Sequence, residues 1–385
     1  MKIKTIRDME ELETIRPYWE AWQCHPNSDF EHFKLVCKLR PEILCPYVIV
    51  IEENSQPRLL LAGRLEQTSF SPAIGYFRPV RIPAKVLVII YQGLLGEKSV
   101  ESAEALVQYL WSLVVAGEAD AVVFHNLPDH SPLLSALLRC GPRWWCEKKF
   151  AWSMHWTMNL PEGHGSALQN FGSKHRNVIR KKQRKLESGF PNNLSWRWIT
   201  KCNDVSDLCK RLEAVAAGTY QRGLAVGFSD NEEKCLRYEF FSNRGQLRVQ
   251  ELVIKNKVEA YWAGTVYGDT YYVDETGFNP NLSPYSPGTV GLIRMAETLA
   301  REGVKIFDFG FGDAVYKSRY GNQYCREATV RLFAPTTKGF ALRSSIGFIG
   351  WLNNLGRKLL KQMKMLDRLK KQWRRQITPH SKDEE

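Results

Sequence analysis

The most informative stretch of the chain runs from Tyr271 to Lys317 and reads YYVDETGFNPNLSPYSPGTVGLIRMAETLAREGVKIFDFGFGDAVYK. Its pattern predicts a strand over 270–277, a loop punctuated by proline and glycine, a long amphipathic helix over 289–302 and a second strand over 304–309. A strand, a helix and a strand in this order favour a parallel crossover, in which the helix packs on the sheet.

The first half of the chain repeats this order of elements. Strands are expected over 46–52, 58–67, 85–91, 121–125 and 151–160, with helices over 8–22, 99–117 and 131–140. No residue-level identity links the two halves, so an internal duplication is inferred from the order alone. Together with the length of 385 residues, this predicts a mixed α/β fold with two similar domains, 1–165 and 189–337.

The net charge of +13 is concentrated in two short segments. Residues 166–188 carry seven Lys or Arg against one acidic residue, and residues 338–385 carry twelve against four. The two large blocks are therefore close to neutral, which argues against a nucleic-acid-binding domain with a basic face throughout. We interpret 166–188 as a basic connecting helix and 338–385 as a basic amphipathic tail.

Several classes of protein are excluded by what the sequence lacks. No apolar run reaches the length of a membrane-spanning helix, and the N-terminus has no secretory signal pattern. The nine cysteines form no CxxC pair, and HExxH, GxSxG and Walker motifs are absent. These features predict a cytoplasmic protein with reduced thiols and no metal.

The start of the helix over 289–302 is a candidate anion site. Ser286-Pro287-Gly288 precedes it, and the free amides and dipole at a helix N-terminus favour an anion such as a diphosphate. An ordinary loop with a helix cap is the alternative interpretation.

Two motifs in this half carry a resemblance to a known family. One is TGF-x-P, SPG, a long helix and EG-x-x-x-FDFG-x-GD-x-x-YK, and the other is S-K-x-R-x-x-x-R over residues 173–180. Together they resemble the CelD-type acetyltransferases of the GNAT superfamily, which are named for their association with cellulose and exopolysaccharide biosynthesis. The resemblance covers roughly residues 150–335. Such proteins are similar to the Fem-type aminoacyltransferases, which have two GNAT-like folds in tandem.

The resemblance implies that acyl-CoA is the co-substrate and that its diphosphate lies at the start of the long helix. The residues implied for that contact are Tyr285, Ser286, Gly288, Thr289, Val290 and Gly291. The chain departs from the family's usual phosphate loop, Q/R-x-x-G-x-G/A, and Pro287 has no amide to donate. Another activated acyl group therefore remains open as the donor.

Acyl transfer of this kind needs a base for the attacking amine or hydroxyl and an acid for the leaving thiolate. Glu275 is the first candidate base, Tyr316 the candidate acid, and Asp308 and Lys317 the further catalytic candidates. Asp313, in the same glycine-rich bend, is a candidate for substrate binding. The alternatives are structural: Asp308 could pair with Lys317 or cap the next turn, Glu275 could be solvated, and Tyr316 could belong to the core.

The two basic segments each allow two interpretations. Lys174, Arg176 and Arg180 could bind phosphates of the donor or an anionic acceptor, or they could form a solvated helix face. Residues 340–376 combine apolar and basic residues in a pattern suited to an anionic membrane surface, on the inner face of the membrane. A helix packed on the protein itself is the alternative.

The sequence thus predicts an acyltransferase that acts on an amine or hydroxyl of a sugar or cell-envelope precursor. One alternative is an aminoacyl-tRNA-dependent, Fem-like transferase, with tRNA as the nucleic-acid partner. The other is a non-catalytic scaffold of a polysaccharide assembly complex.

Overall fold

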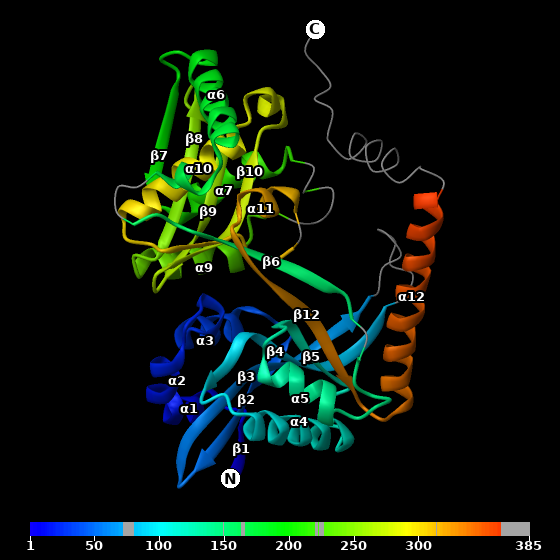
Figure 1. Ribbon diagram of the computed structural model, residues 1–385. Helices are drawn as coiled ribbons and strands as arrows, with labels where there is room; N and C mark the ends of the chain where they lie inside the picture. The colour runs from blue at the N-terminus through cyan, green and yellow to red at the C-terminus, as the bar shows by residue number, and fades with distance from the viewer. Residues whose placement is uncertain are drawn as a thin grey trace. The chain divides into compact units, whose positions relative to one another are not determined.

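The computed structural model describes residues 1–71, 81–148, 150–162, 166–219, 222, 227–312 and 314–362. The chain divides into two compact units (Figure 1). Unit 1 comprises Met1–Met154 and the chain from Cys325 through α12, and unit 2 comprises His155–Tyr324. The chain thus passes from unit 1 to unit 2 within β6 and returns within β12.

Unit 1 is a mixed sheet in the order β1-β2-β3-β4-β5-β12, with helices on both faces. Its strands are β1 (Lys2–Ile6), β2 (Ile43–Glu53), β3 (Gln56–Phe70), β4 (Ile82–Gly96), β5 (Ala121–Pro128) and β12 (Gln323–Phe333). Its helices are α1 (Met9–Leu12), η1 (Glu13–Ile15), α2 (Arg16–Trp22), η2 (Pro26–Ser28), α3 (Phe30–Leu39), α4 (Val100–Val115), α5 (Pro132–Cys140) and α12 (Thr337–Gln362). Since side chains alternate between the faces of a strand, α4 and α5 cover one apolar face, and α2, α3 and α12 lie against the other.

Unit 2 has the sheet order β7-β8-β9-β10-β11-β6. Its strands are β6 (Trp152–Asn159), β7 (Leu194–Ile199), β8 (Leu247–Ile254), β9 (Lys257–Tyr267), β10 (Thr270–Phe278) and β11 (Ile306–Asp308). Its helices are η3 (Ala167–Asn170), α6 (Ser173–Gly189), α7 (Val205–Ala216), α9 (Glu232–Asn243), η4 (Pro280–Tyr285), α10 (Pro287–Arg301) and α11 (Val315–Tyr320). The helices α6 and α10 pack on one face of the sheet, and α7 and α9 pack on the other.

The two units share one strand topology, which confirms the mixed α/β fold and the repeated order of elements. In each, the fourth and fifth strands are parallel: β4 with β5, and β10 with β11. The sixth strand is exchanged, because β6 pairs with β11 in unit 2 and β12 pairs with β5 in unit 1. The compact units therefore differ from the sequential ranges 1–165 and 189–337, since each half of the chain contributes its last strand to the other unit.

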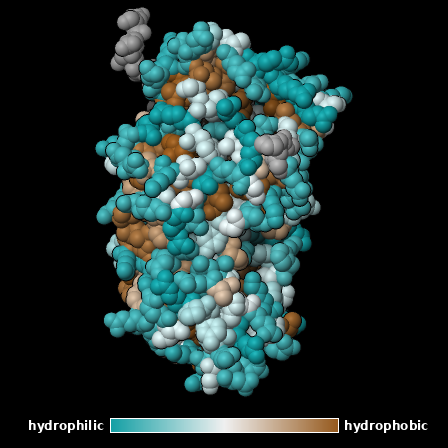
Figure 2. Space-filling view, turned by 90° about the vertical axis from the view of Figure 1, so that its left-hand side faces the viewer, coloured by the Kyte–Doolittle hydropathy of each residue, from teal (hydrophilic) through white to brown (hydrophobic). Residues whose placement is uncertain are grey.

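The C-terminal helix α12 is partly packed on unit 1. Leu342 and Ile346 lie in an apolar cluster with strand residues of that unit, and Ile349 is buried. Phe340, Phe348, Trp351 and Leu355 are exposed, and the rings of Phe348 and Trp351 are stacked with centroids 6.1 Å apart. Among the described residues, no helix is both long and apolar enough to cross a membrane. The surface in Figure 2 is mostly hydrophilic, with separate apolar patches.

Candidate active site

A cavity of about 460 Å³ opens in unit 2 where the two parallel strands diverge. β10 pairs with β11 only from Thr270 to Tyr272, although β10 continues to Phe278. The cavity is lined by residues of the sheet, of α10, of α11 and of the neighbouring loops. They are Trp262 and Thr276–Phe278 of the strands, Gly288, Thr289 and Leu292 of α10, Tyr316 and Tyr320 of α11, and Thr219, Pro280 and Ser283. A concave, largely apolar site with a few polar groups is typical of ligand binding.

The start of α10 forms one wall of this cavity. Ser286 adopts a left-handed conformation with φ 53° and ψ 49°, and its carbonyl accepts hydrogen bonds from Thr289 N at 3.1 Å and Val290 N at 3.2 Å. Pro287 has no amide. Gly288, which lines the cavity, is therefore the first-turn residue whose amide takes part in neither of these bonds.

The six residues implied for diphosphate contact are not all placed at the cavity. Gly288 and Thr289 line it. Tyr285 packs against Phe190 with ring centroids 4.9 Å apart, and Val290 is buried in the apolar cluster beneath α6. Gly291 lies against Trp262, where a side chain would meet the indole ring at 3.1 Å. Tyr285, Val290 and Gly291 thus pack the helix start, and Ser286 turns the chain into it.

A cluster of basic side chains lies beside Thr289. Lys182 Nζ donates to Thr289 Oγ1 at 3.4 Å, and the Tyr320 hydroxyl lies 3.3 Å from the same oxygen. His175 packs on Tyr320, with ring centroids 5.4 Å apart. Burial and the positive charge of Arg319 lower the pKa of Lys182 and of His175, and Lys182 lowers the pKa of His175 further. The positive charges of Lys182 and Arg319 repel each other, so an anion bound beside them would be stabilised.

The three basic residues chosen from the sequence face elsewhere. Lys174 and Arg180 are exposed, and Arg176 donates to the carbonyl oxygen of Phe171 at 3.0 Å. Sequence reasoning missed His175 and Lys182, although a signal existed. They share a helical stripe with the apolar residues Ile179 and Leu186, both buried, and such a stripe marks the inward face of a helix.

Glu275 lies on the face of the sheet opposite α10. A β-bulge between Val273 and Glu275 directs Asp274 and Glu275 to the same side. Asp274 forms an ion pair with Arg237 of α9, and Glu275 forms one with Lys234 of the same helix. Glu275 therefore lies within the strand expected over 270–277, but it is not among the residues that line the cavity.

Asp308 stabilises the turn that follows β11. Its Oδ1 lies 2.7 Å from His155 Nε2 of β6 and accepts the amide of Gly310 at 2.7 Å. Asp308 is 7% exposed and His155 is 5% exposed. Both bonds satisfy a carboxylate that would be costly to bury alone. His155 was not predicted, because its partner is more than 150 positions away in the sequence.

Lys317 holds the same turn from its other side. It is 6% exposed, and its Nζ donates to the carbonyl oxygens of Gly310 at 2.9 Å and Phe311 at 2.5 Å. Its neighbour Tyr316 lines the cavity, with its ring 6.1 Å from that of Trp262. Asp313 lies outside the described residues. The structure thus brings Tyr316, Gly288 and Thr289 to one cavity and uses Asp308 and Lys317 to hold the adjoining turn.

Residues 173–318 match the family model of the acetyltransferase (GNAT) domain. This range contains both parallel strands, β10 and β11, and the residues that line the cavity except Tyr320. Residues 173–318 thus have the sequence pattern of a GNAT acetyltransferase domain. No curated protein sequence matches the chain.

Solved structures with similar folds include FemX, at 10% identity and a TM-score of 0.55, with 86% of this chain and 97% of that chain covered. L-PGS from Bacillus licheniformis matches at 11% identity and a TM-score of 0.51, covering 89% and 98%. A protein of unknown function from Bacteroides thetaiotaomicron matches at 10% identity and a TM-score of 0.51, covering 86% and 100%. At these identities the similarity establishes the fold alone.

Proposed function

We propose that unit 2 transfers an acyl group from acyl-CoA to an amine or hydroxyl of a sugar or cell-envelope precursor. The observation that carries this proposal is the 460 Å³ cavity, which opens where β10 and β11 diverge and has the start of α10 in its wall. A GNAT domain implies an acyl donor and an acceptor, and this cavity is large enough to receive part of each.

The donor's diphosphate would lie between the Gly288 amide and the cluster of His175, Lys182 and Arg319. The Gly288 amide supplies fewer hydrogen-bond donors to a diphosphate than a glycine-rich loop does. The basic side chains would supply the missing donors. Charge-assisted hydrogen bonds from such side chains are stronger than those from neutral donors. The thioester would then point along the cavity toward Tyr316.

We assign Tyr316 as the acid that protonates the leaving thiolate, because it is the catalytic candidate that lines the cavity. Glu275 remains the proposed base. It adjoins Thr276 of the cavity wall, pairs with Lys234 of α9 and lies on the face of the sheet that α7 and α9 cover. Thr219, which follows α7, also lines the cavity. An acceptor that enters from the side of α7 would meet this carboxylate. Asp308 and Lys317 are proposed as positioning residues.

The acceptor class rests on the resemblance to CelD-type proteins. An aminoacyl-tRNA-dependent transferase is the second candidate, and one surface favours it. On α6, Lys174, Arg180, Lys181, Arg184 and Lys185 are all exposed and would suit an extended polyanion. The scaffold alternative is less favoured, because a non-catalytic fold has no need of an open cavity in this position.

We also propose that α12 and the residues that follow, 340–376, bind an anionic membrane surface. Phe340, Phe348, Trp351 and Leu355 form an exposed stripe at helical spacing, and the sequence beyond it is strongly basic. Flotation with phosphatidylglycerol vesicles should recover the full chain but not a chain that ends at residue 336. Equal recovery of both would refute this attachment.

The decisive experiment for the catalytic proposal is isothermal titration calorimetry of the full chain with acetyl-CoA and with charged tRNA. We expect saturable binding of acetyl-CoA with one site per chain. Binding of charged tRNA without acetyl-CoA binding would select the second candidate. Binding of neither would contradict the enzyme proposal.

A further inference from the structure

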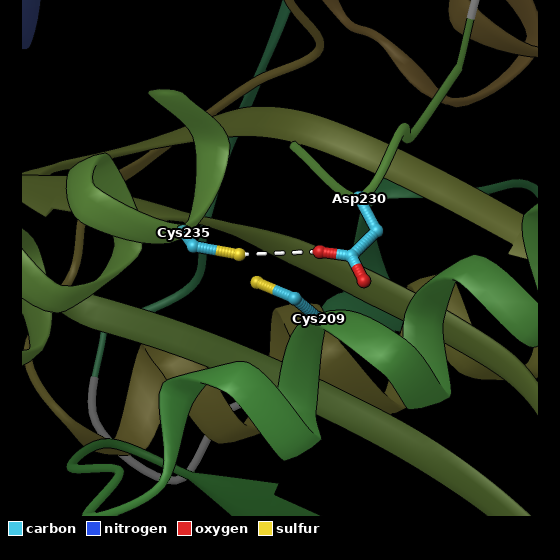
Figure 3. Close-up of side chains that lie close together, drawn as sticks. All are labelled: Cys209, Asp230 and Cys235. Carbon is cyan, nitrogen blue, oxygen red and sulfur yellow. Dashed lines mark hydrogen bonds between the residues drawn. The ribbon is translucent and has the colours of Figure 1, made fainter. Parts of the chain in front are cut away.

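Three side chains with metal-binding atoms converge in unit 2, away from the cavity (Figure 3). Cys209 projects from α7, Cys235 from α9, and Asp230 from the segment that precedes α9. Their ligand atoms all lie within 4.8 Å of one another, and Cys235 Sγ donates to Asp230 Oδ1 at 3.2 Å. The three groups point toward a common space from three separate parts of the chain.

Asp230 is held in place by hydrogen bonds of its own amide and of the residue that follows it. The Asp230 amide donates to Glu213 Oε2 of α7 at 3.0 Å. The next residue, Asn231, caps α9, because its Oδ1 accepts the amide of Lys234 at 2.9 Å. Asp230 is therefore fixed between α7 and the start of α9, and the site is already organised for a ligand.

The burial of the three residues forms a gradient from core to solvent. Cys209 is fully buried, Cys235 is partly buried and Asp230 is exposed. A cation could thus reach the site from solvent through the carboxylate and be held by the sulfurs below. Cys209 and Cys235 are in no disulfide, so both sulfurs are available as ligands.

We infer that Cys209, Asp230 and Cys235 form a binding site for a thiophilic divalent cation of the zinc class. Two thiolates and a carboxylate are a ligand set that zinc accepts, with water in the fourth tetrahedral position. Zinc–ligand bonds of about 2.3 Å to sulfur and about 2.1 Å to oxygen would separate the ligand atoms by about 3.6–3.8 Å. The observed limit of 4.8 Å needs only a small contraction. On binding, the two thiol protons pass to solvent.

Such an ion would join α7 to α9 and so stabilise a region that includes part of the cavity wall. Thr219 lines the cavity just after α7, and Lys234, the neighbour of Cys235, forms the ion pair with Glu275. The inference does not rest on the proposed acyl transfer, because none of the three residues lines the cavity.

The test is metal titration of the reduced, metal-free full chain, with Zn²⁺ measured by competition with a chromophoric chelator and Co²⁺ measured by absorbance. We expect one equivalent of each ion and a sulfur-to-cobalt charge-transfer band. Asp230→Asn should weaken zinc binding at least about tenfold, since even changes outside the ligand set commonly cost that much. Cys235→Ser should remove most of the charge-transfer band.

The matched control is Cys45→Ser, which changes a partly buried free thiol in unit 1. It should bind both ions as the unmodified chain does, and circular dichroism should show that every variant is folded. Lack of zinc and cobalt binding by the unmodified chain would overturn the inference. Equal binding by Cys235→Ser, or a Cys209–Cys235 disulfide in place of metal binding, would overturn it as well.

Discussion

Unit 1 and unit 2 have the same strand topology but very different openings between their parallel strands. In unit 2, one extra residue of β10 bulges at Asp274, and the cavity measures about 460 Å³. In unit 1, β4 bulges by several residues between Ile89 and Leu94, opposite Ala62. These residues line a cavity of only about 130 Å³. The larger bulge of unit 1 therefore goes together with the smaller cavity.

The helices that follow the fourth strand, α4 and α10, also differ in how their first turns are capped. In unit 1, the Ser99 side chain caps α4 by accepting the amide of Ser102 at 3.1 Å. In unit 2, Ser286 precedes α10 in a left-handed conformation and makes no side-chain cap. A capped helix start has one amide fewer to offer a ligand. In unit 2, the smaller bulge and the larger cavity thus go together with a helix start that no side chain caps.

The largest effect is expected from a substitution that fills the cavity of unit 2. Thr289→Trp should weaken acetyl-CoA binding at least about 100-fold, or about 2.7 kcal/mol, because the indole would occupy the helix start. Calorimetry measures the loss. His130→Trp changes an exposed residue of the unit 1 cavity and should leave binding unchanged. The reverse result would move the donor site to unit 1.

A smaller effect is expected from removing one charge beside α10. Lys182→Gln should weaken acetyl-CoA binding about three- to tenfold, since Lys182 is partly exposed and solvent screens its charge. Lys181→Gln removes the same charge from the exposed side of α6 and serves as the matched control. If the two variants weaken binding equally, the effect comes from general charge and not from a site at Thr289.

The smallest effect concerns pH. Burial, Arg319 and Lys182 lower the pKa of His175, so the imidazole is uncharged at neutral pH. A bound phosphate favours the charged form, and binding should therefore take up a proton and strengthen by a few-fold as pH falls from 8 to 6. Calorimetry in buffers of different ionisation enthalpy would detect that proton. Affinity that is constant with pH, with no proton taken up, would place His175 outside the site.

Most elements of the fold could be predicted from the sequence, and the exceptions have physical causes. The strand expected over 304–309 is β11, and the helix expected over 289–302 is α10. The helix expected over 8–22 is instead divided into α1, η1 and α2, because Pro17 has no amide and begins a new helix. β1 was missed because a short, charged strand at the N-terminus has little local signal of its own.

The candidate site was predicted less completely than the fold. Gly288, Thr289 and Tyr316 line the cavity. Lys174, Arg176 and Arg180 were chosen for their charge and for their positions in the S-K-x-R-x-x-x-R motif, whereas the inward side of α6 presents His175 and Lys182. Charge shows that a helix is basic, but the direction of each side chain depends on which stripe is buried.

The amino-acid sequence by itself determined the order of strands and helices, the mixed α/β class and the position of the strand–loop–helix segment at the cavity. These features follow from periodicity and turn residues over a few positions. Only the tertiary structure decided the exchange of β6 and β12, the direction of Glu275, and the meeting of Cys209, Asp230 and Cys235. Each of these depends on strand register or on contacts between distant residues, and a single bulge is enough to move a side chain from one face of a sheet to the other.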